Sequence, residues 1–204
     1  MGIMNTIHYF TKQPTKHKYK ISFELAGTTI NLLSSNGVFS KKHIDTGTKV
    51  LIESIVEKIS IHENAEILDL GCGYGIIGIT IAKLNPKAKV TMVDINPLAI
   101  KLTNENIKLN LVENAIVIRS HLYSQLENKK FDFIISNPPL AAGYKVIFPL
   151  IEGAKDHLKE RGRIIIVLRK GINTIPKKMK DVFGNVELLY KRAGYRVFQS
   201  IKTS

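Results

Sequence analysis

The sequence is poor in the residues that mark several classes of protein. It has a single cysteine, Cys72, among 204 residues. One cysteine excludes an internal disulfide framework and is typical of proteins from a reducing compartment. Glycine occurs 14 times and proline 7 times, without forming linker-like or low-complexity tracts. The chain is therefore expected to form one globular unit.

Long apolar runs are also missing from the sequence. No stretch approaches the roughly 18 consecutive apolar residues that a membrane-spanning helix needs. Residues 1–10 lack the basic-then-apolar order of a signal peptide. We therefore expect no membrane partner and predict a cytoplasmic location. The apolar content of 44% is nevertheless enough for a full-sized core.

Positive charge is what the chain has in excess. The formal net charge is +13, and residues 140–204 hold 14 of the 30 Lys and Arg residues but only 5 of the 17 acidic ones. A basic surface attracts phosphate polyanions, whereas the plainer interpretation is a solvated, lysine-rich face. Because the excess is concentrated in one third of the chain, we favour a nucleic-acid partner.

The hydrophobic patterns predict an α/β fold. Residues 18–33 alternate apolar and polar side chains around Ala26-Gly27, which predicts a β-hairpin. From residue 65 onwards, strand patterns alternate with helical ones, as in a parallel sheet covered on both faces. We expect a small N-terminal β-hairpin extension over residues 1–36 and one Rossmann-like domain over residues 37–204.

The predicted elements of this domain end in an antiparallel hairpin. The predicted sheet strands are residues 66–69, 89–94, 115–119, 131–136, 163–168, 186–190 and 195–201. The predicted helices are residues 46–59, 76–84, 97–110, 146–159 and 174–183. Ligands of such sheets bind at the carboxyl ends of the strands, and the main motifs follow predicted strands.

A glycine-rich loop follows the first of these strands, in the run Asp69-Leu-Gly71-Cys-Gly73-Tyr-Gly75. Glycines let the backbone turn sharply and approach a ligand closely. A dinucleotide fingerprint would need glycine at position 76, which is isoleucine. Asp69 would repel a pyrophosphate but can accept hydrogen bonds from an ammonium group. The loop therefore favours S-adenosylmethionine over a dinucleotide.

A second acid, Asp94, ends the next predicted strand. A carboxylate at this position can accept hydrogen bonds from two ribose hydroxyls. Asp94 follows Asp69 by 25 residues, a spacing typical of a nucleotide-binding α/β unit. The alternative to a domain that binds S-adenosylmethionine is a Rossmann-like domain that binds another nucleotide or no nucleotide.

The segment Ser136-Asn137-Pro138-Pro139-Leu140 follows the fourth predicted strand. The amide oxygen of Asn137 and the carbonyl of Pro138 can accept both hydrogens of a planar NH2 group. Such bonds would aim the nitrogen lone pair at an electrophilic methyl group, so that positioning supplies most of the acceleration. The plainer alternative is a proline turn that caps the strand.

These motifs resemble those of class I S-adenosylmethionine-dependent methyltransferases. The run from Ile67 to Gly75 resembles their motif I and Val93-Asp94 their motif II. Asn137-Pro-Pro resembles motif IV of the enzymes that methylate exocyclic amino groups or carboxamide nitrogens. Residues 37–48, with Asp45-Thr-Gly47, resemble the RsmC-type ribosomal RNA guanine-N2 methyltransferases and their single-domain archaeal relatives.

The resemblance implies a mostly parallel, Rossmann-like class I sheet with a closing antiparallel hairpin, and S-adenosylmethionine as cofactor. It implies catalytic roles for Asn137, Pro138, Pro139 and Leu140. The implied cofactor contacts are Asp45, Gly47, Asp69, Gly71, Cys72, Gly73, Gly75, Asp94, Ile95, His121, Leu122 and Asn137.

Two positions depart from the family pattern. Leu140 stands where an aromatic residue often stacks on the target base, so apolar contact remains but π-stacking is lost. His121 stands where an acid usually accepts a hydrogen bond from the adenine amino group. A neutral histidine can still accept through one ring nitrogen.

We predict an N-methyltransferase for an exocyclic nitrogen of ribosomal RNA, either guanine N2 or adenine N6. Two alternatives stay open, a protein glutamine-N5 methyltransferase and a non-catalytic cofactor-binding partner subunit. No metal site is predicted, because the histidines show no ligand spacing. The candidate RNA phosphate contacts are Lys41, Lys42, Lys145, Arg169, Lys170, Arg192 and Arg196.

Overall fold

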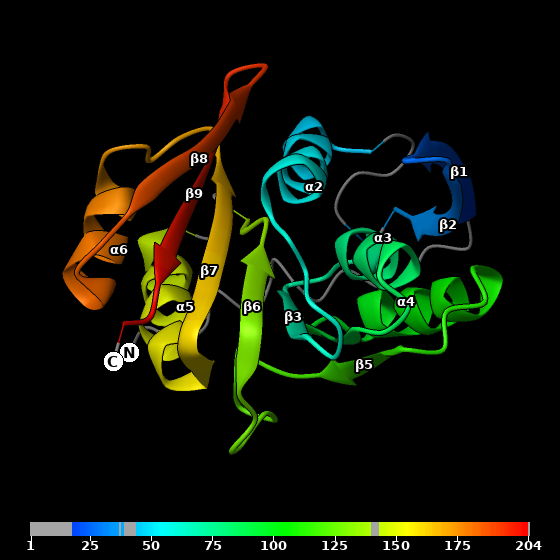
Figure 1. Ribbon diagram of the computed structural model, residues 1–204. Coiled ribbons are helices and arrows are strands. Elements are labelled where there is room, and N and C mark those ends of the chain that lie inside the picture. The colour runs from blue at the N-terminus through cyan, green and yellow to red at the C-terminus, as the bar shows by residue number, and fades with distance from the viewer. Residues whose placement is uncertain (1–17, 37, 39–43, 140–142, 204) are drawn as a thin grey trace, which may run out of the picture.

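The computed structural model describes residues 18–36, 38, 44–139 and 143–203. A seven-stranded sheet lies between two layers of helices, and a two-stranded hairpin lies outside one layer (Figure 1). The hairpin strands are β1 (Lys18–Leu25) and β2 (Thr28–Ser35). The sheet strands are β3 (Glu66–Leu70), β4 (Lys89–Asp94), β5 (Ala115–Arg119), β6 (Phe131–Ser136), β7 (Leu158–Leu168), β8 (Glu187–Arg192) and β9 (Tyr195–Ile201). The helices are α2 (Thr46–Lys58), α3 (Ile76–Leu84), α4 (Pro97–Leu109), α5 (Tyr144–His157) and α6 (Thr174–Phe183).

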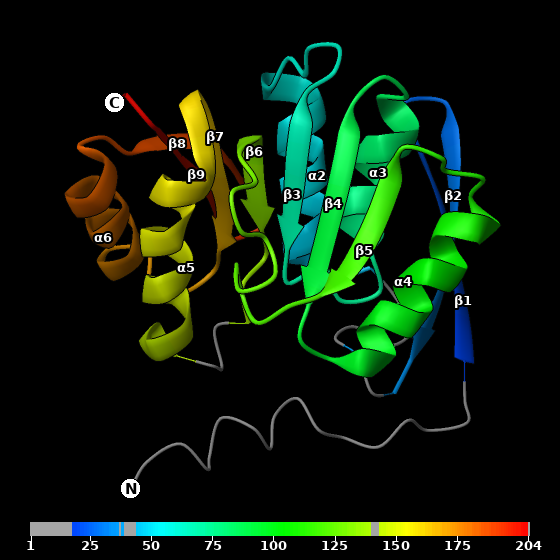
Figure 2. The same ribbon diagram turned by 90° about the horizontal axis from the view of Figure 1, so that it is seen from below.

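The strand order in the sheet is β5-β4-β3-β6-β7-β9-β8. Strands β3 to β7 are parallel, and β9 pairs antiparallel with both β7 and β8. This confirms the mostly parallel, Rossmann-like sheet and its closing antiparallel hairpin. The chain moves from β3 out to β5 and then returns to the other side of β3 as β6 (Figure 2). A ligand crevice is expected at this switch point, beyond the carboxyl ends of β3 and β6.

The sheet is buried on both faces, which explains the continuous apolar run of β7. Ile165 and Val167 pack into the core beneath α2, α3 and α4. Ile164 and Ile166 pack into the second core, beneath α5 and α6. Alternate residues of a strand face opposite sides, so a strand between two helical layers needs apolar side chains throughout.

Asn106 of α4 and the residue that caps the end of this helix, Asn110, dock the N-terminal hairpin. The side chain of Asn106 accepts from the Leu33 amide at 2.7 Å and donates to the Leu33 carbonyl at 2.9 Å. Asn110, one turn further on, forms the same pair of bonds with Asn31. These amide side chains bond the β2 backbone as a neighbouring strand would. The hairpin also buries Ile30 in the core shared with the sheet.

The predicted helix over residues 146–159 is wrong at its C-terminal end. Helix α5 ends at His157, and β7 begins at Leu158, which pairs with Phe131 of β6. Burial of Leu158 and this pairing outweigh the local helix propensity of the segment. Gly162 permits the close approach, since a Cβ there would lie 2.9 Å from two backbone oxygens. Within the described ranges, no helix has the length and apolarity to cross a membrane.

Candidate functional site

The carboxyl ends of β3 and β6 are joined at the switch point. The Ser136 hydroxyl donates to the Leu70 carbonyl at 2.7 Å. The glycine-rich loop leaves β3 at Leu70, and Asn137 leaves β6 at Ser136. The two motifs therefore lie side by side, although they are more than 60 residues apart in the sequence.

The glycines of the loop serve two purposes. Gly71, Gly73 and Gly75 have φ values of +80°, +58° and +88°, a region that L side chains rarely adopt. A Cβ at Gly71 or Gly73 would meet no atom within 4 Å, so the loop presents bare backbone on an open side. A Cβ at Gly75 would lie 2.7 Å from Thr103. The first two glycines thus form a cradle that a ligand can approach, while the third permits packing on α4.

Helix α4 holds the loop from behind. The Thr103 hydroxyl donates to the Gly73 carbonyl at 3.0 Å, and the Asn106 amide donates to the Tyr74 carbonyl at 2.8 Å. The Cys72 thiol is buried beside Thr103, and burial raises the pKa of the Cys72 thiol. The Cys72 side chain therefore packs inward, which leaves its backbone as the part able to face a cofactor.

Asp69 is fully buried beneath the first turn of α3. Its Oδ2 accepts from the Gly78 amide at 2.8 Å, while Oδ1 has no hydrogen-bond partner among the described residues. Burial, with a smaller contribution from Asp94, raises the pKa of Asp69 to about 7. A buried acceptor without a hydrogen-bond partner lowers the stability of the folded state. A donor or cation bound at this position would offset that loss.

Asp94 ties the loop to the start of α4. Its Oδ2 accepts from the Gly73 amide at 2.9 Å and its Oδ1 from the Asn96 amide at 2.8 Å. Burial raises the pKa of Asp94, although these amide bonds oppose the shift. The Ile95 amide also hydrogen-bonds this carboxylate. The acceptor capacity that remains keeps the predicted role toward ribose hydroxyls available.

Three more predicted cofactor contacts, Ile95, His121 and Leu122, lie next to Asp94. The Ser120 amide donates to the Asp94 carbonyl at 3.0 Å, which brings the end of β5 beside the end of β4. His121 follows and is exposed, Leu122 is partly buried, and Ile95 accepts from Arg119 at 3.2 Å. The candidate residues thus form a row along one edge of the sheet, in the strand order β6, β3, β4 and β5.

Asn137 is held by residues from the start of α2. Its Nδ2 lies 3.0 Å from Oδ2 of Asp45 and 2.9 Å from the hydroxyl of Thr48. Asp45 is also the N-cap of α2, because the same Oδ2 accepts from the Thr48 amide at 3.0 Å. The sequence motif indicates Asp45 but not Thr48, although a side chain three residues after an N-cap lies close to the cap.

Gly47, the third residue of the Asp45-Thr-Gly47 motif, packs against an aromatic ring. A Cβ at Gly47 would lie 2.7 Å from Cε1 of Tyr195, the first residue of β9. The guanidinium of Arg169 lies 5.6 Å from the centre of the same ring. The sequence does not indicate Tyr195 as a site residue, because nothing in its local pattern predicts proximity to residue 47.

Five predicted phosphate contacts gather where the parallel strands of the sheet end, which we call the carboxyl edge. Arg169 and Lys170 follow β7, and the antiparallel pairing of β7, β9 and β8 places Arg196 and Arg192 at the same end. Lys145 lies in the first turn of α5, which follows the motif after β6. Arg192 also forms an ion pair with Glu53 of α2 at 2.8 Å. The predicted residues Lys41, Lys42 and Leu140 lie outside the described residues.

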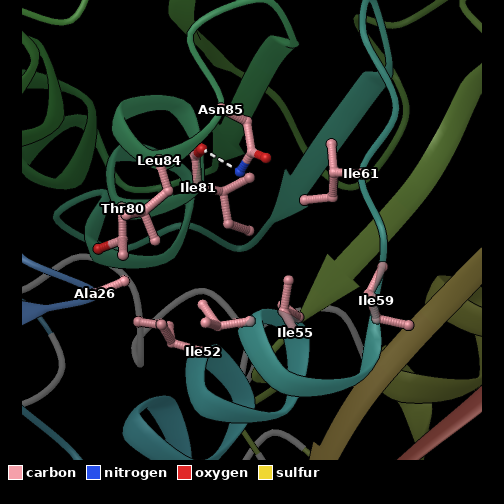
Figure 3. Close-up of a pocket in the computed structure, with 10 residues that line it drawn as sticks. Ala26, Ile52, Ile55, Ile59, Ile61, Thr80, Ile81, Leu84 and Asn85 are labelled. Atoms are coloured by element: carbon pink, nitrogen blue, oxygen red, sulfur yellow. Dashed lines mark hydrogen bonds between the residues drawn. The ribbon is translucent and has the colours of Figure 1, made fainter.

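An apolar pocket of ≈ 240 Å³ lies elsewhere, between α2 and α3 (Figure 3). Its lining includes Ile52, Ile55 and Ile81, from the later turns of the two helices, and no charged side chain. Both helices begin at the carboxyl edge, so this pocket lies towards the opposite edge of the sheet. No cluster of three or more potential metal ligands occurs in the part of the chain that is described.

Comparison with known sequences gives close matches. The family model for the methyltransferase small domain matches residues 29–199. The uncharacterized protein YbxB of Bacillus subtilis is 34% identical over 200 residues, covering 96% of this chain and 98% of that protein. Ribosomal RNA small subunit methyltransferase C of Haemophilus influenzae is 35% identical over 173 residues, covering 83% of this chain. The chain spans about half the length of that relative, with 50% of it covered.

Solved structures share the fold. The 16S rRNA guanine-N2 methyltransferase (RsmC) of Thermus thermophilus, in complex with AdoMet and guanosine, superposes with a TM-score of 0.84 at 24% identity. The match covers 92% of this chain and 51% of that one. A methyltransferase from Pyrococcus furiosus superposes with a TM-score of 0.67 at 20% identity, covering 83% and 91% of the two chains.

Proposed function

The chain belongs to the methyltransferase small domain family and is an S-adenosylmethionine-dependent methyltransferase of class I, and on that premise we propose that it methylates an exocyclic base nitrogen of ribosomal RNA. Guanine N2 is the first target to test and adenine N6 the second. The names of the relatives, ribosomal RNA small subunit methyltransferase C and a 16S rRNA guanine-N2 enzyme, support this order. With an RNA substrate of this kind, we also propose a cytoplasmic location.

The residues at the carboxyl edge fit the cofactor. S-adenosylmethionine supplies an electrophilic methyl group on a positively charged sulfur. The bare backbone of Gly71 and Gly73 leaves room for a ligand. Oδ1 of Asp69 has no hydrogen-bond partner among the described residues and can accept from a ligand. The acceptor capacity that the Asp94 carboxylate keeps beside its backbone amide partners suits ribose hydroxyls. These residues therefore bind and orient the cofactor, and none of them needs to act as an acid or base.

The observation that carries the proposal is the placement of Asn137. It follows β6 directly and lies next to the glycine-rich loop, with its Nδ2 occupied by Asp45 and Thr48. The amide oxygen and the Pro138 carbonyl are then the acceptors for the two hydrogens of a planar amino group. Hydrogen bonds from the amino group stabilise the positive charge that develops on its nitrogen as the methyl group is transferred.

The charge at the same edge favours RNA over a protein amide. Arg169, Lys170, Arg196 and Lys145 lie at the end of the sheet where Asn137 lies. Phosphate contacts of this kind position a polyanion without reading its sequence. A glutamine side chain would fit the same two acceptors but would make no use of the basic edge.

The proposal is tested by methyl transfer from labelled cofactor. The purified protein is incubated with ribosomal RNA, with small ribosomal subunits and with total protein, all from cells that lack the gene. Nucleoside analysis then separates N2-methylguanosine from N6-methyladenosine. We expect label in ribosomal RNA, and a loss of about 100-fold or more in the Asn137→Ala variant, because one positioned acceptor is removed.

The matched control is Asn104→Ala, which removes an exposed asparagine from α4, away from the carboxyl edge. It should leave the rate of transfer unchanged. Label in protein glutamine and not in RNA would support the alternative substrate. Tight cofactor binding without transfer to any fraction would contradict the proposed activity.

A further inference from the structure

We propose that Asp45 and Thr48 are positioning residues that hold the Asn137 amide in the one orientation in which its oxygen faces the substrate. This inference rests on the proposed function, since it concerns how the same site aligns the amino group. It assigns to Asp45 and Thr48 a role in substrate alignment, whereas the sequence motif implied only a cofactor contact for Asp45.

The chemistry of the partners fixes the orientation of the amide. An asparagine side chain has similar shapes at its two ends, with a donor at one and an acceptor at the other. The end that lies 3.0 Å from Oδ2 of Asp45 faces a carboxylate, which can only accept. A reversed amide would bring two acceptor oxygens to this distance. The NH2 group therefore faces Asp45, and the oxygen faces the opposite direction.

The two partners are themselves held by the start of α2. Oδ2 of Asp45 accepts from the Thr48 amide at 3.0 Å, and the Asp45 carbonyl accepts from the Lys49 amide at 3.0 Å. Thr48 is buried, and its hydroxyl lies 2.9 Å from Nδ2 of Asn137. Asp45, Thr48 and Asn137 thus form a closed network. Groups placed by a helix terminus are held more firmly than groups on a free loop.

The carboxylate also affects the strength of the substrate contact. An amide that donates to a carboxylate becomes more polarised, so its oxygen becomes a better acceptor for the substrate amino group. The negative charge of Asp45 lies on the far side of the amide from the nitrogen that becomes positive. Loss of the network should therefore lower kcat more than it changes cofactor affinity.

Thr48 offers a cleaner test than Asp45, because replacement of Asp45 would also remove the cap of α2. Thr48→Val keeps the shape of the side chain and the backbone amide but removes the hydroxyl. Thr48→Ser keeps the hydroxyl and serves as the conservative control. The quantities to measure are kcat and KM with ribosomal RNA, the cofactor affinity by calorimetry, and the Tm. They are measured for each variant alone and for each variant combined with Asn137→Ala.

We expect Thr48→Val to lower kcat about tenfold, the effect of one hydrogen bond, with cofactor affinity unchanged within about twofold. Thr48→Ser should restore most of the activity. In the Asn137→Ala background, Thr48→Val should have no further effect, because the residue acts through Asn137. Full activity of Thr48→Val, or an equal loss in both backgrounds, overturns the inference.

A second measurement does not depend on the substrate. The side-chain NH2 protons of Asn137 should exchange with solvent more slowly than those of the exposed Asn128 in NMR spectra. Thr48→Val should accelerate the exchange at Asn137 and leave Asn128 unchanged. Equal exchange at the two asparagines of the unmodified protein overturns the inference. Absence of methyl transfer to RNA, with the Asn137 protons still protected, contradicts the proposed function alone.

Discussion

The ring of Tyr195 fills the space that Gly47 leaves open next to Asp45. A Cβ at Gly47 would lie 2.7 Å from Cε1 of Tyr195 and 3.0 Å from Oδ2 of Asp45. The same oxygen holds Asn137 at 3.0 Å. The glycine of the Asp45-Thr-Gly47 motif therefore permits close packing between α2 and β9, at the point where α2 positions the amide of Asn137.

Gly47→Ala should lower both stability and activity. The added methyl group must displace the Tyr195 ring or the Asp45 carboxylate, and overpacking of this kind costs about 1–3 kcal/mol. Urea denaturation and methyl-transfer rates measure the two effects. Thr46→Ala, on the exposed side of the same turn, is the control. A Gly47→Ala protein that matches this control in both measurements would contradict the packing role.

Local patterns in the sequence were enough to predict most of the fold. The start of α4 at Pro97, the strand Phe131–Ser136 and the helix Thr174–Phe183 follow from local periodicity and helix-start preferences. The row of candidate residues along one edge follows from the rule that parallel strands end together. The start of β7 at Leu158 could not be predicted, because pairing with Phe131 decides it.

The contacts around Asn137 were beyond sequence reasoning for a related reason. Asp45 and Asn137 are 92 residues apart, and nothing local indicates that the start of α2 approaches the end of β6. Tyr195 reaches Gly47 only because β9 inserts antiparallel beside β7. Motifs predict which strand ends carry the chemistry, whereas the order of strands in the sheet decides which side chains then support it.

The raised pKa of Asp69 predicts how stability varies with pH in the cofactor-free protein. Its pKa rises on folding from 3.8 to about 7, so the folded state binds the proton more tightly than the unfolded state. The resulting stabilisation is fully present below about pH 4 and is lost as the pH rises to about 7. Over this window the loss amounts to at most about 4 kcal/mol.

Denaturation of the protein and of the Asp69→Asn variant at pH 5, 6, 7 and 8 checks this prediction. The side chain at position 69 of the variant carries no charge at any of these pH values. Its amide oxygen can still accept from the Gly78 amide. Its stability relative to the unmodified protein should therefore increase from pH 5 to pH 7 and then level off. A difference that is constant with pH would show that Asp69 does not titrate in this range.

Cofactor binding should release a proton from Asp69 near neutral pH. A positively charged ligand favours the ionised carboxylate and thus lowers the pKa of Asp69. Calorimetry at pH 6.5 in two buffers with different ionisation enthalpies measures the protons released. S-adenosylhomocysteine, which lacks the positive sulfur, should release fewer. Asp69→Asn should abolish the difference between the buffers, and its persistence in that variant would assign the proton to another group.

Removal of charge from the end of β7 should weaken RNA binding in a salt-dependent way. Arg169→Gln and Lys170→Gln each remove one candidate phosphate contact from the carboxyl edge. Each should reduce the slope of log K against log salt by about 0.7 for single-stranded RNA. Arg161→Gln, at the opposite end of the same strand, is the matched control. Equal effects of all three substitutions would mean that the basic edge has no special role.

Asn106 should support both the N-terminal hairpin and the glycine-rich loop. Its buried side chain bonds the amide and carbonyl of Leu33 in β2 and the carbonyl of Tyr74 in the loop. Asn106→Leu would leave these three backbone groups without that partner, so a loss of about 2–4 kcal/mol is expected.

Hydrogen exchange followed by mass spectrometry separates a local effect of this substitution from a global one. Exchange should accelerate in residues 28–35 and 71–75 together, and cofactor affinity should fall. Asn104→Leu, on the exposed face of the same helix, should change neither segment. Faster exchange in the hairpin alone, with unchanged cofactor affinity, would show that Asn106 docks β2 without supporting the loop. Joint acceleration would instead show that Asn106 supports both the N-terminal hairpin and the glycine-rich loop.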